Sequence, residues 1–370
     1  MPHPATIMQL ALRIAFELKK HLEMALYMPH EVAESLPSFD ATISTLLKAT
    51  LPQCSNTFTL CYPTTPFSKV SPTIDWPEIQ AYGVPNPKFL ESLSTPDLQV
   101  VVREGVQSIS IFNQEKMILR FPLWTVLWWH SVTNARQAQA VWARARTWAS
   151  RARANCRDEA VLALDQLGWT TRLTSDYAGG EVLGLKLSVL LTPSWVGEDV
   201  IDLMLESLSR EAGRKEDIMV CSNAYTRLLI QRYQLEAVTD QSLMTELDRA
   251  VEAGKDIYFI ENVNQNHWIA IKVSVKEQTI FIGDSLQMSH AQNLQKALRS
   301  YFAEVFQSVM HTRVLEIGKQ TDYISCAICA VNALRHDLLG ERIWEGSRAD
   351  ENCMLVRICQ YFLAEVRVVY

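Results

Sequence analysis

Residues 255–286 read KDIYFIENVNQNHWIAIKVSVKEQTIFIGDSL, and this stretch decides the fold. Its runs of β-branched and aromatic residues, separated by polar turn residues, are typical of β-strands. They predict strands at Ile257–Ile260, Trp268–Val273 and Thr279–Gly283. We expect the last two strands to be neighbours in an antiparallel hairpin.

The register of that hairpin places two polar side chains together. If the hairpin is centred between Val275 and Lys276, His267 lies directly opposite Asp284. Paired side chains share one sheet face at Cβ separations of about 4.5–5.5 Å, so an imidazole and a carboxylate can form a hydrogen bond. The carboxylate would orient the ring and stabilise its protonated form.

A second stretch, GKQTDYISCAICAVNALRHDLLG at residues 318–340, predicts a helix that begins at Cys326. Ser325 is typical of a helix N-cap and Gly340 of a helix stop. Apolar residues recur at helical spacing and predict a buried stripe of Ile328, Val331, Leu334 and Leu338.

The two stretches together contain the parts of an acyl-transfer site. Unpaired amides and the dipole at a helix start stabilise a thiolate, and a neighbouring histidinium adds to this effect, so Cys326 can serve as a nucleophile. The side-chain amide of Gln320 and the Cys326 backbone N–H could hold a developing oxyanion. Taken singly, a histidine at a strand start is more often structural and a helical cysteine more often part of the core. The prediction therefore depends on the joint pattern.

Composition limits the other classes of protein. The chain has 370 residues, 48% hydrophobic and 21% charged, which predicts a folded protein of two or three domains. Its apolar runs fall short of the roughly 20 residues that a membrane span requires, and Glu17 interrupts the run that a signal peptide would need. We therefore expect no membrane partner and a location in the nucleus or cytoplasm. The eight cysteines are irregularly spaced without a paired zinc pattern, so we expect reduced thiols and no metal site.

The N-terminal 165 residues predict a mostly helical region of unknown role. Residues 1–50 have helical periodicity, whereas six prolines within residues 62–88 predict a long loop without regular helix. Residues 98–121 predict two strands with a turn near Asn113, and a tryptophan-rich core segment follows them.

A long helix is predicted over residues 134–167. It carries arginines largely off its apolar stripe, namely Arg136, Arg144, Arg146, Arg151, Arg153 and Arg157. Because the net charge of the chain is −6, we interpret them as a solvated helix face and expect no nucleic-acid partner. A second domain, over residues 170–370, is predicted to hold the chemistry.

The spacing of the chemical residues resembles the SUMO-protease family, cysteine proteases that process ubiquitin-like modifiers and share their fold with the adenovirus protease. The family has His-Trp, then an Asp seventeen residues later, and then a Gln six residues before the Cys. His267-Trp268, Asp284, Gln320 and Cys326 keep each of these spacings. The resemblance implies an α+β, papain-like (adenain-like) domain with a central mixed sheet and the nucleophile at a helix N-terminus.

The resemblance also implies a role for each residue of the pattern. Cys326 would attack the scissile carbonyl, and His267 would act as base and then as acid. Asp284 would orient His267, and Gln320 would line the oxyanion hole. The family usually has Asp-Cys-Gly at the nucleophile, whereas this chain has Ser-Cys-Ala, and its next helical cysteine, Cys329, is closer than the family's usual second one.

Two tryptophans are candidates for substrate binding. Trp195-Val196-Gly197-Glu198 is similar to a family motif, Trp-Leu-Asn-Asp, that precedes a helix. By the resemblance, Trp195 and Trp268 would clamp the terminal Gly-Gly of the substrate, because a slot walled by two indoles admits glycine and excludes side chains. Ordinary core packing is the alternative for both.

The resemblance implies a thiol peptidase or isopeptidase that cleaves after the C-terminal Gly-Gly of a ubiquitin-like modifier, SUMO-like above others, or a similar glycine-rich tail. It implies no metal or organic cofactor. The expected partner is a ubiquitin-like protein or its conjugates, and the N-terminal region could contact a further protein. Two alternatives stay open at this point, an acyltransferase on the same scaffold and a non-catalytic interaction module.

Overall fold

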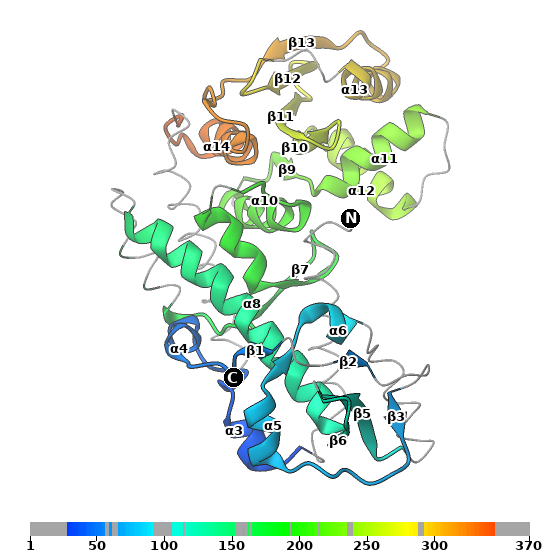
Figure 1. Cartoon of the computed structure of the whole chain (residues 1–370). Coiled ribbons are helices and arrows are strands. Elements are labelled where there is room, and N and C mark those ends of the chain that lie inside the picture. The colour runs from blue at the N-terminus through cyan, green and yellow to red at the C-terminus, as the bar shows by residue number, and fades with distance from the viewer. Residues whose placement is uncertain are drawn as a thin grey trace. The chain divides into compact units, whose positions relative to one another are not determined.

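The computed structural model describes residues 28–55, 59–60, 66–91, 106–113, 115–151, 158, 162, 165–192, 194–213, 215–234, 240–287 and 292–344. The chain divides into two compact units, Met1–Ala143 and Arg144–Tyr370 (Figure 1). The predicted boundary at residues 165–170 lies C-terminal to this division. None of the described helices has the length and apolar character needed to span a membrane.

The N-terminal unit combines short helices with small sheets. Its helices are α3 (His30–Glu34), α4 (Ile43–Lys48), α5 (Trp76–Tyr82), α6 (Pro87–Glu91) and the first part of α8 (Trp124–Arg151). Its strands are β1 (Cys54–Ser55), β2 (Thr59–Leu60), β3 (Phe67–Ser68), β4 (Val84–Pro85), β5 (Ser108–Phe112) and β6 (Ile118–Pro122). β1 pairs with β4 in parallel, and β5 pairs antiparallel with β2, β3 and β6.

A tryptophan-rich core holds this unit together. Trp128 and Trp129 on α8 are fully buried, and the ring of Trp76 meets that of Trp128 edge-on at a centroid distance of 5.0 Å. The β5–β6 hairpin has the predicted turn, in which the Asn113 N–H donates to the Met117 carbonyl at 3.1 Å. The tryptophan-rich segment is therefore core, as predicted, and it forms one helix with the following residues. The parts of the predictions that fall on residues 1–27 and 98–105 lie outside the described residues.

The prediction of a long loop over residues 62–88 is wrong in its second half. α5 begins at Trp76 and has Pro77 in its first turn, where a helix needs no backbone N–H from the residue. Asp75 and Glu78 form a capping box, with the Glu78 N–H donating to Asp75 Oδ1 at 3.1 Å and the Asp75 N–H to Glu78 Oε2 at 3.2 Å. α6 likewise begins with a proline, Pro87. These prolines start helices, and proline count alone does not predict a loop.

The C-terminal unit contains a five-stranded mixed sheet. Its first elements are β7 (Arg172–Ser175), β8 (Gly180–Leu183), the 3₁₀-helix η1 (Gly184–Leu191), α10 (Glu198–Ala212), β9 (Ile218–Val220), α11 (Asn223–Tyr233) and α12 (Gln241–Glu252). Then follow β10 (Asp256–Val263), β11 (His267–Ser274), β12 (Thr279–Gly283), α13 (Gln292–Phe306), β13 (His311–Val314) and α14 (Cys326–Leu339). The strand order is β13-β12-β11-β10-β9, with antiparallel pairing among β10, β11 and β12 and parallel pairing at both edges. The three predicted strands are confirmed as β10, β11 and β12.

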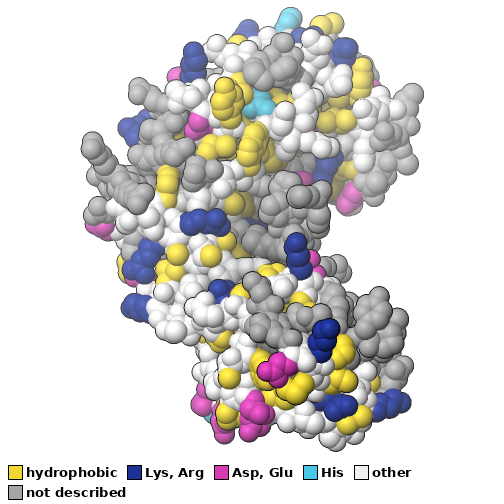
Figure 2. Space-filling model, viewed as in Figure 1, with side chains coloured by type: hydrophobic (Ala, Val, Ile, Leu, Met, Phe, Trp, Pro, Cys, Tyr) yellow, Lys and Arg dark blue, Asp and Glu magenta, His cyan; other side chains and the backbone are white. Residues whose placement is uncertain are grey.

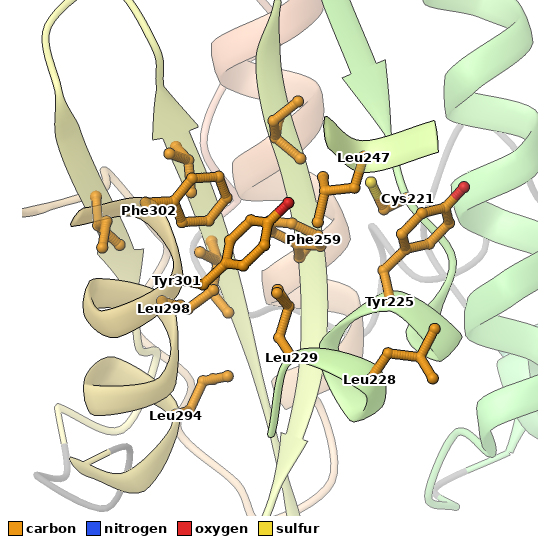
Figure 3. Close-up of a cluster of buried hydrophobic side chains, with 14 of the residues drawn as sticks. Cys221, Tyr225, Leu228, Leu229, Leu247, Phe259, Leu294, Leu298, Tyr301 and Phe302 are labelled. Carbon is orange, nitrogen blue, oxygen red and sulfur yellow. The ribbon is translucent and has the colours of Figure 1, made fainter. Parts of the chain in front are cut away.

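Helices cover both faces of this sheet. Phe259 of β10 packs with Leu229 of α11 and Phe302 of α13 in one apolar cluster, shown in Figure 3. Alternate strand residues point the other way. Tyr258 and Lys272 both bind Asp337 of α14, with oxygen–oxygen and nitrogen–oxygen distances of 2.7 and 2.8 Å. The result is a three-layer α/β/α arrangement of the predicted α+β class. α14 lies on the face opposite α11 and α13, and its Arg335 binds Glu211 of α10.

The predicted register of the β11–β12 hairpin is wrong, because the hairpin is centred one residue further along the chain, between Lys276 and Glu277. Ser274 pairs with Thr279 and Ala270 with Gly283, so the connection has four residues. Its last residue, Gln278, has a left-handed φ of 48°, and its N–H donates to the Val275 carbonyl at 3.3 Å. This turn has no Asn-Gly pair, and a glutamine does not predict a left-handed backbone conformation. The shift displaces the partner by two residues, so the side chains predicted to share a face still do.

Candidate active site

His267 begins β11 because a tight turn precedes it. Asn264 and Gln265 have φ of 56° and 58°, as a type I′ turn requires, and the Asn266 N–H donates to the Val263 carbonyl at 3.3 Å. The backbone N–H of His267 donates to the Asn262 side-chain oxygen at 3.2 Å. The position of the imidazole is therefore set by the β10–β11 hairpin.

His267 and Asp284 form a hydrogen-bonded pair. His267 Nε2 lies 2.7 Å from Asp284 Oδ1, and the two side chains are only 4% and 15% exposed. Asp284 directly follows β12, diagonal to His267, and its Oδ1 also accepts the Leu286 N–H at 2.9 Å. The two residues predicted to meet are thus brought together, across a diagonal and not as a direct pair.

The environment of His267 favours its charged form. Burial disfavours a charged imidazole, but the hydrogen bond with the Asp284 carboxylate and the neighbouring Cys326 outweigh burial and raise the pKa of His267 to about 9. The second ring nitrogen, Nδ1, is buried and makes no hydrogen bond of normal geometry. Because Asp284 occupies Nε2, Nδ1 is the nitrogen available to the thiol of Cys326.

Cys326 is the first residue of α14, as predicted, and it is fully buried. Ser325 occupies the N-cap position, but its side chain does not cap the helix. Its hydroxyl instead donates to Asp322 Oδ2 at 2.7 Å, while Asp322 Oδ1 accepts the N–H groups of Ile324 and Ser325 at 2.9 and 2.8 Å. Asp322 therefore fixes the turn that delivers the cysteine to the helix start.

Gln320 is held beside the pair by a serine. The Ser285 hydroxyl donates to Gln320 Oε1 at 2.5 Å, and the Gln320 backbone N–H donates to the Ser285 carbonyl at 3.2 Å. The Gln320 side-chain amide donates to the Asp322 carbonyl at 2.7 Å. Both Gln320 and Ser285 are buried. Because Ser285 follows Asp284, these bonds connect the end of the β11–β12 hairpin to the loop that precedes Cys326.

The loop that carries Gln320 is also fixed at its base. The Leu315 N–H donates to the Ile282 carbonyl at 3.0 Å. Gly318 lies against the chain after α14, so close that a Cβ atom there would come within 1.9 Å of the Trp344 carbonyl oxygen. Asn332 of α14 accepts the Trp344 N–H at 2.8 Å and so holds that segment in place. Only glycine fits at position 318 without a backbone shift.

The two candidate substrate-binding tryptophans lie in different environments. Trp195 is 45% exposed, whereas Trp268 is only 2% exposed. The Trp268 indole N–H donates to the Val196 carbonyl at 3.0 Å. Trp268 therefore anchors the segment that presents Trp195, next to the start of α10.

Two residues of this site were missed by sequence reasoning, Ser285 and Asp322. Asp322 had a local signal, since an aspartate three residues before a helix-starting serine is typical of an Asx-type turn. Ser285 had none, because its partner Gln320 is 35 residues away along the chain.

Other features of the described residues lie apart from this site. No group of three or more His, Cys, Asp or Glu side chains in the described part could hold a metal ion. A cavity of about 930 Å³ beside β9 is lined in part by Tyr177, Met219, Tyr225 and Arg249 and includes none of the predicted site residues. On the face in Figure 2, the described Lys and Arg side chains are dispersed among hydrophobic and acidic ones.

The chain was compared with known protein families and solved structures. Residues 194–336 match the model described as "Ulp1 protease family, C-terminal catalytic domain", and this segment contains all six predicted site residues. No curated protein matches the chain.

Solved structures also resemble the chain. A SUMO protease Ulp1, with its catalytic cysteine oxidised to a sulfonic acid, is 17% identical and covers 56% of this chain and 94% of its own, with a TM-score of 0.45. The C-terminal Ulp1 protease domain in complex with Smt3, the yeast orthologue of SUMO, is 18% identical with the same coverages and a TM-score of 0.44. The Xanthomonas campestris effector XopD bound to ubiquitin is 17% identical over 45% of this chain and 91% of its own, with a TM-score of 0.34.

Proposed function

Residues 194–336 form a cysteine protease domain of the Ulp1 family, as the residue spacing predicts, and from this we propose that the chain cleaves ubiquitin-like modifiers after their C-terminal Gly-Gly. The reaction is thiol-dependent hydrolysis of a peptide or isopeptide bond, with a SUMO-like modifier as the expected substrate. The observation that carries the proposal is the 2.7 Å hydrogen bond between His267 and Asp284 beside a cysteine at a helix start.

In the proposed reaction each residue has a separate task. The Cys326 thiolate attacks the scissile carbonyl, and the helix start and Gln320 stabilise the oxyanion that develops. Protonated His267 gives its proton to the leaving amine, which leaves a thioester on Cys326. Neutral His267 then removes a proton from water, the resulting nucleophile attacks the thioester, and the carboxylic acid leaves as Cys326 is restored. Asp284 holds the ring in the orientation that both transfers need.

Burial of the nucleophile favours glycine in the substrate. Cys326 has no exposed surface, and the ring of His267 beside it is nearly as buried. An extended backbone without side chains is the slenderest peptide that can be threaded to such a thiol. We propose that exposed Trp195 contacts the glycine tail, and that Trp268 contributes as the second wall of the slot and as the anchor of the Trp195 segment.

We also propose roles for the rest of the chain. Residues 170–370 would act as the catalytic domain in the nucleus or cytoplasm, and residues 1–165 would recruit a protein partner. The N-terminal unit has its own tryptophan core, which supports a separate role for it.

The direct test uses ubiquitin-like proteins that carry an electrophile at their C-terminus. The full chain and its Cys326→Ala variant are incubated with a panel of such probes, and intact mass is measured. Cys221→Ala is the control, because it removes a buried thiol from the apolar cluster beside the sheet. The expected result is an adduct with one probe that disappears only in Cys326→Ala. If a small thiol reagent labels Cys326 while no probe does, the modifier proposal is wrong and another acyl substrate is indicated. If neither labels Cys326, the non-catalytic alternative becomes the leading one.

Ser285→Ala is expected to lower kcat about tenfold with little change in KM. Loss of the Ser285 hydroxyl leaves Gln320 Oε1 without its donor, so the amide can turn away from the oxyanion, although removal of the whole donor costs more, about 10²–10³-fold. Steady-state hydrolysis of a ubiquitin-like substrate measures the effect.

The matched control for that variant is Ser274→Ala, because Ser274 is a buried serine on the same hairpin. Ser285→Ala and Gln320→Ala should also be non-additive, since both act on one amide. Unchanged kcat in Ser285→Ala, or full additivity with Gln320→Ala, would contradict this role.

A further inference from the structure

Two cysteines share the first turn of α14. Cys326 is the first residue of the helix and Cys329 follows it by three, in the sequence Cys-Ala-Ile-Cys. Neither is in a disulfide, and both are buried, at 0% and 2% exposure. Residues three apart lie on the same side of a helix, with Cβ atoms about 5–6 Å apart.

We propose that Cys329 is a resolving thiol for Cys326, which makes the pair a reversible oxidation site for hydroperoxides. The inference rests on the proposed function for the reactivity of Cys326, and it adds a chemical role for Cys329 that hydrolysis does not need. The two thiols would close into a disulfide that occupies the nucleophile.

The helix start allows this closure. A disulfide requires Cβ atoms about 3.5–4.5 Å apart, so the first turn must tighten by one to two ångströms. Cys326 is the terminal residue of α14 and follows a loop, so it can move without breaking the helix beyond Cys329. The cost on the helix side is small, because the Cys326 N–H is among the first four of the helix, which have no intrahelical partner, and only its carbonyl bond has to adjust.

The surroundings favour attack within the chain over attack by another molecule. The raised pKa of His267 keeps a positive charge beside the Cys326 sulfur at neutral pH. A hydroperoxide is smaller than the peptide that the proposed reaction brings to the same sulfur, so an opening that admits substrate also admits it. Cys221, another buried cysteine, packs in the cluster with α11, α12 and α13 (Figure 3). Cys329, in contrast, is three residues from Cys326 on the same helix.

The steps balance as an ordinary two-electron oxidation. The Cys326 thiolate attacks the peroxide oxygen, the O–O bond breaks, and a sulfenic acid forms as hydroxide or alkoxide leaves. The Cys329 sulfur then attacks the sulfenic sulfur, the S–O bond breaks, and water leaves with the Cys329 proton. Two thiols are oxidised and one peroxide is reduced. A dithiol reductant reverses the step by thiol–disulfide exchange.

The expected consequence is protection of the nucleophile. Without a resolving thiol, a sulfenic acid proceeds to sulfinic and sulfonic acids, which dithiols do not reduce. With Cys329 present, oxidation stops at the disulfide. The protein would lose activity under peroxide and recover it afterwards.

The test compares the full chain with Cys329→Ala after a small excess of hydrogen peroxide. Mass analysis of the tryptic peptide between Lys319 and Arg335 should show a loss of about 2 Da in the wild type and gains of about 16 Da per oxygen in Cys329→Ala. Dithiothreitol should restore most of the wild-type activity. The fraction of activity that it restores in Cys329→Ala should be about tenfold smaller. Before oxidation, Cys329→Ala should hydrolyse substrate normally.

Controls separate this inference from the proposed function. Cys221→Ala should behave as wild type, and Cys326→Ala should show no loss of 2 Da in that peptide. The inference is wrong if wild type and Cys329→Ala gain the same oxygens, or if the disulfide joins Cys326 to a different cysteine. If the peptide loses about 2 Da in a protein that cleaves no modifier, the oxidation site stands and the proposed substrate does not.

Discussion

Cys326→Ala is expected to lower kcat by about 10⁴-fold or more, because it removes the sulfur that is proposed to form the thioester. KM should change little, since alanine leaves the walls of the site in place and removes one buried sulfur. Hydrolysis of a ubiquitin-like protein with a fluorogenic C-terminal amide measures both constants.

The control for this prediction is a second cysteine variant in the same domain. Cys221→Ala removes a fully buried thiol from the sheet core and should retain kcat within about threefold after allowance for stability. His267→Ala combined with Cys326→Ala should be no slower than Cys326→Ala, because the two residues act as one unit. A Cys326→Ala protein that still turns over would overturn the assignment of the nucleophile.

The second large effect is expected from Asp284→Asn, with a fall in kcat of about 10²–10⁴-fold and a changed pH profile. The wild-type imidazole has a pKa raised to about 9, so it stays protonated through neutral pH and loses its proton as pH rises through 9. Wild-type activity should therefore fall on the alkaline side near pH 9. Asparagine removes the negative charge at 2.7 Å, so the pKa of His267 drops and the alkaline fall moves to lower pH.

Stability should follow the same titration. Because the folded pKa of His267 lies above its unfolded value of about 6.5, the pair stabilises the fold fully below that pH, and the contribution is lost as pH rises through 9. Asp284→Asn should remove the pH dependence of the free energy of unfolding between pH values of about 6.5 and about 9. Thermal unfolding at a series of pH values measures it, and an alkaline limb that stays at the same pH in the variant would show that Asp284 does not set the pKa of His267.

Local patterns predicted most of the catalytic half. The three strands and the helix from Cys326 follow from apolar periodicity and end signals that lie within a few residues of each element. The fixed spacing from His267 to Cys326 indicated the family that the chain resembles and the order of the predicted site residues along the sequence. The strands and the helix depend on residues that are near one another in the sequence. The family resemblance depends on the fixed separations between His267, Asp284, Gln320 and Cys326.

Features that depend on conformation or distance were not predicted. The hairpin register depends on Gln278 in a left-handed conformation, which its side chain does not favour. The Ser285–Gln320 bond depends on packing between distant segments. The difference between buried Trp268 and exposed Trp195 arises from tertiary cover, since both are tryptophans next to a regular element. The helix α5, in contrast, could have been predicted, because Asp75 and Glu78 have the spacing of a capping box. The number of prolines in this segment favoured a loop instead.

The order of the site along the chain has a consequence for synthesis. His267 and Asp284 come from one hairpin, so they can meet as soon as β11 and β12 have left the ribosome. Cys326 follows only after α13 and β13, and its helix must then close onto Tyr258 and Lys272 of the finished sheet. A nascent chain therefore carries the base for some time without a thiol to activate. If the proposed function holds, the site is complete only when its last described helix docks on the sheet.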